Sequence, residues 1–277
     1  MNDLTNANVG GLDLFFGGSN PGLTGFEDID QSDLAIGKYK LLQPLSEEVV
    51  NRDIDASSGQ FYNAQTGVAV DEINCYLLSV SKSRAWFEYP FKKGSTAICS
   101  SIDCVTGRTR DSVNKSCQGC PHADWNKAKA DGKEKPDCTQ SYVWLGADLE
   151  NDVPFRMTVG GAAFKSCRQF ISQQAMKGAA LFTYDIKISS KQVNSPKGSY
   201  YEPVFTIVNE YTANDLKSLS PEKQAELIQV FTARQELLKS LKDIFENARR
   251  HDAIHGDIVE AEATEVVEDA GETGTMF

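Results

Sequence analysis

Residues 73–89 read INCYLLSVSKSRAWFEY and contain two short apolar and aromatic runs, Ile73–Val80 and Ala85–Tyr89. The polar stretch Ser81-Lys82-Ser83-Arg84 separates the runs and has the length of a hairpin turn. Because β-branched and aromatic side chains favour strands, this segment predicts a β-hairpin. We assign that hairpin to a mainly β (α+β) fold.

The remaining pattern predicts more strands and one helix inside the body. From Ala162 to Lys177 the apolar residues recur at helical spacing, and Gly178 supplies a residue suited to ending a helix. Strands are expected at Tyr142–Ala147, Phe155–Val159, Leu181–Ser189 and Tyr201–Tyr211. Strands interrupted by one helix predict a small barrel.

A long helix is expected at the C-terminal side of this body. Ser220 is a suitable N-cap, Pro221 fits the first helical position, and apolar residues follow at steps of three and four to about Arg250. We therefore divide the chain into a flexible arm at 1–35, a body at 36–218, a helix at 219–250 and a disordered acidic tail at 251–277. A loop at 99–138 is inserted in the body.

The net charge of −11 conceals a strong segregation along the chain. Residues 1–60 carry ten acidic and three basic side chains, and residues 251–277 carry eight acidic and no basic ones. Residues 82–200 carry 18 basic and 11 acidic side chains. A basic middle between two acidic ends is typical of a protein that binds a polyanion.

Five of the seven cysteines fall within 40 residues and suggest a structural zinc site. Cys117-Gln-Gly-Cys120 has the spacing of a zinc knuckle, and Cys99 and Cys138 flank it at equal separations. A metal would also explain how a loop poor in apolar residues becomes ordered. Cys104 or His122 could replace one ligand, and free thiols or a redox pair remain the alternative. Cys75 and Cys167 are expected in the core.

Several enzyme classes lack their motifs in this sequence. There is no GxxxxGK[ST] loop, no GxGxxG after a strand and no His-x-Glu before the cysteine pair. No nucleophile and base can be paired, so we expect a protein that is not an enzyme. The first residues lack the basic and apolar regions of a signal peptide, and we expect a cytoplasmic location, that of the host cell if the protein is phage-encoded.

Basic and aromatic residues alternate through the middle of the chain, as in proteins that bind single-stranded nucleic acid. Such proteins hold phosphates in a positive groove and stack bases on aromatic rings. The aromatic candidates lie beside basic or turn residues. The expected nucleic-acid-binding residues are Lys82, Arg84, Trp86, Tyr89, Lys92, Lys93, Arg108, Lys191, Tyr200 and Tyr201.

The acidic tail suggests two further roles. A flexible polyanion can occupy a cationic groove and be displaced by nucleic acid. Phe277 at the end of the tail is a candidate for binding a partner protein, and a solubilising function is the plain alternative.

With Cys99, Cys117-Gln-Gly-Cys120-Pro121, Cys138 and the acidic run from Glu260 to Phe277, the chain resembles the single-stranded-DNA-binding proteins of tailed bacteriophages. The resemblance implies an OB-like small barrel, a zinc loop, and a tail that recruits replication or transcription proteins. It implies sequence-tolerant binding of single-stranded DNA in replication, recombination or repair. Two alternatives stay open: a single-stranded-DNA-binding cofactor of RNA polymerase, and a zinc-stabilised nuclease or other enzyme. The tail departs from the pattern, since Glu272-Thr-Gly-Thr-Met-Phe277 lacks dense carboxylates before its aromatic end.

Overall fold

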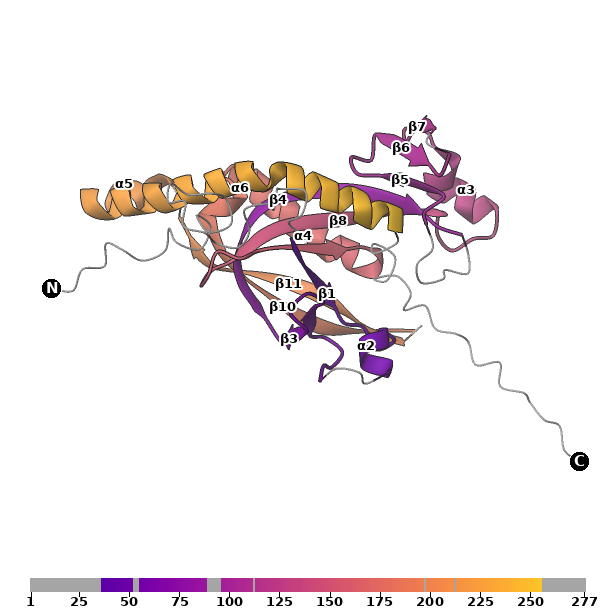
Figure 1. Ribbon diagram of the computed structural model, residues 1–277, viewed down its shortest axis with the longest axis horizontal. Coiled ribbons are helices and arrows are strands. Elements are labelled where there is room, and N and C mark those ends of the chain that lie inside the picture. The colour runs from indigo at the N-terminus through magenta and orange to yellow at the C-terminus, as the bar shows by residue number, and fades with distance from the viewer. Residues whose placement is uncertain are drawn as a thin grey trace, which may run out of the picture.

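A computed structural model describes residues 36–51, 55–88, 96–111, 113–196, 198–211 and 213–255 (Figure 1). The strands are β1 (Gly37–Leu41), β2 (Phe61–Asn63), β3 (Val68–Val70), β4 (Ile73–Trp86), β5 (Cys99–Ser101), β6 (Thr106–Thr109), β7 (Asn114–Ser116), β8 (Cys138–Asp148), β9 (Pro154–Val159), β10 (Tyr184–Ser195) and β11 (Gly198–Glu210). The α-helices are α2 (Glu47–Val50), α3 (Trp125–Ala130), α4 (Phe164–Lys177), α5 (Ala213–Ser218) and α6 (Pro221–His255). Short 3₁₀ turns are η1 (Pro121–Ala123), η2 (Gly161–Ala163) and η3 (Leu181–Thr183).

The described strands form one mixed sheet that branches at the long strand β4. The order along the main path is β3-β2-β1-β9-β8-β4-β5-β6-β7, and among the described strands only the β1–β9 pair is parallel. On one side β4 pairs with β8 along most of its length. On the other side its first residues, Ile73–Cys75, pair with β10, and its last residues, Arg84–Trp86, pair with β5. The two branches therefore leave β4 at opposite ends.

One face of the sheet packs around α4. Trp144 of β8 and Phe170 of α4 are both buried there, with ring centroids 6.0 Å apart, and Phe205 of β11 stacks on Phe170 at 4.8 Å. The expected core cysteines, Cys75 and Cys167, are fully buried in this cluster. Of the two hydrophobic clusters formed by the described residues, this face holds the larger.

The opposite face of β4 and β8 packs against α6. Leu237, Leu241, Ile244 and Phe245 of α6 are buried against strand residues such as Leu145. In Figure 1, α6 lies along the sheet and its N-terminal part projects beyond it. The central strands are thus covered on both faces, which explains the continuous apolar run in β8.

The sheet does not close into the OB-like small barrel that the sequence predicted. Among the described strands, β11 pairs only with β10, β3 only with β2 and β7 only with β6, so all three leave an open edge. The hairpin β10–β11 meets the β1 side through Gln43, whose Nε2 donates to the Tyr201 carbonyl at 2.9 Å and whose Oε1 accepts from the Tyr201 N–H at 2.8 Å. Closure fails because β10 pairs with β4 over three residues and then runs past the start of that strand.

The predicted hairpin turn at Ser81–Arg84 is wrong, because Ile73–Trp86 is one continuous strand. Lys82 is exposed while Ser83 is buried, which is the two-residue alternation of a strand. Hydrogen bonding to β8 runs through this stretch, so the polar residues form part of the ladder. A register shift lies instead between Leu77 and Ser79.

Both predicted helices are present. Helix α4 ends at Gly178, which adopts a left-handed conformation with φ of 73°. Ser220 caps α6, since its Oγ accepts from the Lys223 N–H at 3.4 Å. The helix continues to His255, five residues beyond the expected boundary. None of the helices in the described parts is long and apolar enough to span a membrane.

Candidate nucleic-acid interface

Three of the expected binding residues share one face of the second half of β4. Lys82, Arg84 and Trp86 alternate with buried residues and stand opposite Tyr142, Gln140 and Cys138 of β8. Every second residue of a strand points to the same side, so these three side chains form a row. We call Lys82, Arg84 and Trp86 the β4 strip.

The residues of the β4 strip differ in exposure. Lys82 is exposed, with its Nζ 5.9 Å from the ring centroid of the buried Tyr142. Arg84 is half-buried beside Cys104, which accepts a hydrogen bond from Gln140 Nε2 at 3.5 Å. Burial raises the pKa of the Cys104 thiol, and the Arg84 charge acts in the opposite direction. The strip therefore presents one exposed cation and a second, partly covered positive charge.

The end of α6 holds the β4 strip from the opposite face of the sheet. Arg249 is buried and donates to the carbonyl of Lys82 at 3.1 Å and to that of Ile102. The N–H of Ala97 donates to the Ile254 carbonyl of α6 at 2.8 Å. Desolvation lowers the pKa of Arg249. Its guanidinium donates hydrogen bonds to backbone carbonyls. The helix thereby fixes the position of β4 relative to the β5 branch.

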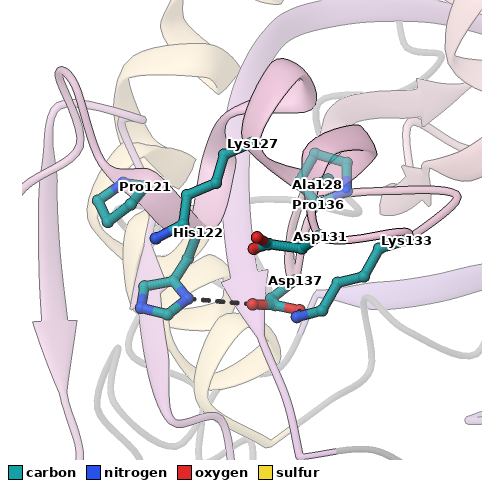
Figure 2. A pocket seen from close by; sticks show the side chains of 8 residues that line it. All are labelled: Pro121, His122, Lys127, Ala128, Asp131, Lys133, Pro136 and Asp137. Atoms are coloured by element: carbon teal, nitrogen blue, oxygen red, sulfur yellow. Dashed lines mark hydrogen bonds and ion pairs between the residues drawn. The ribbon is translucent and has the colours of Figure 1, made fainter.

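Trp86 is covered on one side by a histidine from the inserted loop. The indole and the His122 imidazole stack with centroids 3.9 Å apart and planes 19° apart. His122 Nδ1 lies 3.0 Å from Asp137 Oδ2, and Lys133 Nζ lies 2.6 Å from Asp137 Oδ1 (Figure 2). Hydrogen bonds from Lys133 and His122 lower the pKa of the Asp137 carboxyl. The interaction with Asp137 orients the imidazole against Trp86.

The inserted loop also exposes a tryptophan that the sequence argument missed. Trp125 opens α3 and is 59% exposed, and the exposed Lys127 and Lys129 follow it on the same short helix. Asp124 caps this helix by accepting from the Asn126 N–H at 2.8 Å. The criterion used for the other aromatics, proximity to basic residues in sequence, would have selected Trp125 as well.

The zinc site expected from Cys99, Cys117, Cys120 and Cys138 is wrong. Across the described ranges, no three His, Cys, Asp or Glu side chains form a group that could hold a metal ion, and neither Cys104 nor His122 completes one. All seven cysteines are free thiols, and burial raises the pKa of Cys138 to about 12.

Backbone pairing orders this loop in place of a metal. Strand β5 pairs with β4 and β6, and β6 pairs with β7. Gly107 on β6 lets the neighbouring thiols approach, since an added β-carbon would lie 2.9 Å from Cys99 Sγ and 3.5 Å from Cys117 Sγ. Cys99 and Cys117 thus pack across a glycine, and sequence spacing alone could not separate such packing from metal binding.

The hairpin β10–β11 carries its candidates at a different place in the fold. Lys191 forms an ion pair with Glu202 at 2.9 Å, which raises its pKa. The ring of Tyr201 packs against Gly59, where an added β-carbon would lie 2.5 Å from Cε1. Tyr200 is half-buried on the same strand. The hairpin joins β4 at Ile73–Cys75, which is the end of that strand opposite to the β4 strip.

The remaining candidate residues lie either on the inserted loop or outside the described residues. Arg108 is exposed on β6, within the inserted loop. Tyr89, Lys92, Lys93 and Phe277 lie outside the described residues. The described part of the candidate interface is therefore the β4 strip with the adjoining loop.

Together these features define a protein with an open mixed sheet and a basic and aromatic row beside an inserted loop. The chain belongs to the family of Pam3 phage gp34-like proteins, whose model matches residues 10–232. Comparison with curated proteins and with solved structures finds no match. The family description names a phage and states no activity.

Proposed function

We propose that this protein binds single-stranded DNA during phage DNA replication or recombination, as a protein without catalytic activity. The observation that carries the proposal is the β4 strip, where two cations and an indole share one face of a strand. The phage family supports the biological setting. The exposed Trp125 on the adjoining loop supplies a second aromatic surface.

In this proposal the basic side chains bind phosphates and the aromatic side chains stack on bases. Lys82 contacts a phosphate directly, and the half-buried Arg84 adds positive charge next to it. Bases stack on Trp125 and on the part of the Trp86–His122 pair that remains open, and each stacked base contributes about 1–3 kcal/mol. Such contacts tolerate many sequences because every base has an aromatic face.

The acidic tail competes with DNA for these cations and recruits partners. Residues 256–277 carry seven acidic and no basic side chains. Binding of DNA displaces the tail, after which Phe277 is available to replication or transcription proteins. This is the regulation that the charge segregation of the chain supports.

The test is a fluorescence anisotropy titration of labelled poly-dT of about 20 nucleotides, longer than the site of one small binding domain. We expect binding to be tighter than to duplex DNA of equal length by about tenfold or more, or 1.4 kcal/mol. Equal affinity for both, or no binding to either, refutes the proposal. A cofactor of RNA polymerase would show the same preference and would in addition retain a phage polymerase in a pull-down.

Variants connect that affinity to the β4 strip. Lys82→Ala should weaken binding and reduce the slope of log affinity against log salt by about 0.7, the value for one phosphate contact on a single strand. Arg84→Gln should weaken binding by less, because Arg84 is half-buried. Lys239→Ala removes an exposed lysine from α6, which covers the other face of the sheet, and should leave affinity unchanged. Equal losses in all three variants would point to non-specific charge.

A further inference from the structure

A small cavity lies in the inserted loop beside the Trp86–His122 stack. Its volume is about 120 Å³, well above the 10–15 Å³ that one water needs and below the 300–1,000 Å³ of sites for drug-sized ligands. Pro121, Ala128 and Pro136 contribute apolar surface to it. A cavity of this size, in which three apolar residues stand among charged ones, suits a single flat ring with polar edges.

The polar groups of the cavity fall into two sets. Both carboxylate oxygens of Asp137 have partners, since Oδ2 lies beside His122 and Oδ1 beside Lys133. The side chains of Lys127 and Asp131 also line the cavity, and neither has an ion pair or hydrogen bond within the described part of the chain. Figure 2 draws both side chains among the residues that line the cavity: the Lys127 chain ends near Pro121 and His122, and the Asp131 carboxylate points toward His122. One strong donor and one strong acceptor are thus available to a ligand.

We propose that this cavity binds one guanine base of a bound single strand, an inference that rests on the proposed function. Guanine presents the O6 acceptor next to two donors, N1–H and the N2 amino group. Lysine commonly donates to guanine O6, and a carboxylate has two oxygens that can accept from neighbouring N–H groups. Lys127 therefore binds O6, and Asp131 accepts from N1–H and N2–H.

The position of the cavity fits a strand that runs along the β4 strip. His122 lines the cavity and stacks on Trp86, the last residue of the strip. A strand whose phosphates contact Lys82 and whose bases approach Trp86 would reach the cavity next. Binding then remains tolerant of sequence along most of the strand and gains a preference at one position.

The experiment uses the full chain and labelled oligonucleotides that are all dT except for one central dG, dA or dC. We expect the dG oligonucleotide to bind about tenfold more tightly than all-dT, within the range for one specific base contact. Asp131→Asn and Lys127→Ala should each remove most of this preference and leave the affinity for all-dT nearly unchanged. Lys129→Ala, which changes a lysine of the same helix outside the cavity, should retain it.

The outcomes separate the two proposals. Binding of all-dT without a dG preference overturns the cavity inference alone, as does a preference that survives in Asp131→Asn. Failure to bind any single strand overturns both. A preference for dA or dC that depends on Asp131 would also refute guanine as the ligand.

Discussion

The indole of Trp86 and the imidazole of His122 lie 3.9 Å apart between ring centroids and are nearly parallel. Trp86 ends β4, and His122 belongs to the 3₁₀ turn after the cysteine pair, so the stack joins the central sheet to the inserted loop. His122 is also held by Asp137. The contact therefore sets the position of the cavity relative to the β4 strip.

Removing the imidazole should expose Trp86 and loosen the loop. We expect His122→Ala to shift tryptophan emission to longer wavelength and to lower the free energy of unfolding by about 0.5–1.5 kcal/mol, the contribution of an aromatic pair. The measurement is best made in a Trp125→Phe background, which removes the emission of the exposed tryptophan. Unchanged emission in that background would contradict the stack.

Sequence reasoning succeeded where the signal is local. Gly178 and Ser220 mark helix ends, and both helices are present with the expected boundaries at those residues. It failed where the outcome depends on pairing between distant segments. The composition of Ser81–Arg84 is typical of a turn. These residues form a strand because they pair with β8. The barrel failed for the same reason, since no local pattern reveals that β10 pairs with three residues of β4.

The candidate site shows the same division. Lys82, Arg84 and Trp86 are candidates because they are close in sequence, and strand geometry places them on one face. Tyr201 satisfied the same local criterion, yet its ring packs against Gly59, more than a hundred residues away. His122 was considered only as a metal ligand because nothing in the sequence pairs it with Trp86. Non-local packing thus decides which aromatic side chains are available for binding.

Tyr201 should matter for stability and little for DNA binding. Gly59 adopts φ of 93°, and the ring of Tyr201 covers it. We expect Tyr201→Ala to destabilise the fold by about 3 kcal/mol, near the lower end for loss of a packed aromatic ring, and to leave poly-dT affinity within twofold. Chemical denaturation and anisotropy test the two statements separately. A large loss of affinity in a folded Tyr201→Phe variant would return this residue to the binding surface.

The lowered pKa of Asp137 predicts how the stability of the inserted loop changes at acidic pH. Bonds from Lys133 and His122 hold its pKa below the ordinary value of 3.8, so the folded state favours the ionised carboxylate. The resulting stability is fully present above the ordinary pKa and is lost as pH falls through the folded-state pKa. The difference in unfolding free energy between the natural chain and Asp137→Asn should be present at about pH 5 and shrink below about pH 4. Urea titrations at each pH measure it, and a difference that grows as pH falls below about 4 would contradict the sign.

A buried ion pair secures α6 to the sheet. Arg234 Nη2 lies 2.8 Å from Asp185 Oδ1, both side chains are about nine-tenths buried, and the guanidinium carbon lies 4.2 Å from the Tyr76 ring centroid. Arg234→Met leaves the Asp185 carboxylate buried without its cation and should cost about 3–5 kcal/mol of unfolding free energy. Arg234→Met combined with Asp185→Asn should cost less than the single change, because the uncompensated charge is gone. Additive losses in the double variant would show that the two residues do not interact.

Deleting residues 256–277 tests whether the acidic tail competes with DNA. The deletion removes seven carboxylates and no basic side chain, so the truncated chain should bind poly-dT more tightly at low salt. Screening shortens the range of the effect from about 10 Å at 0.1 M salt to about 3 Å at 1 M, and the advantage should disappear as salt is raised. Phe277→Ala in the full chain is the control: it keeps every charge and should leave DNA affinity unchanged while weakening partner capture. Equal affinity of the truncated and full chains at low salt would reject competition by the tail.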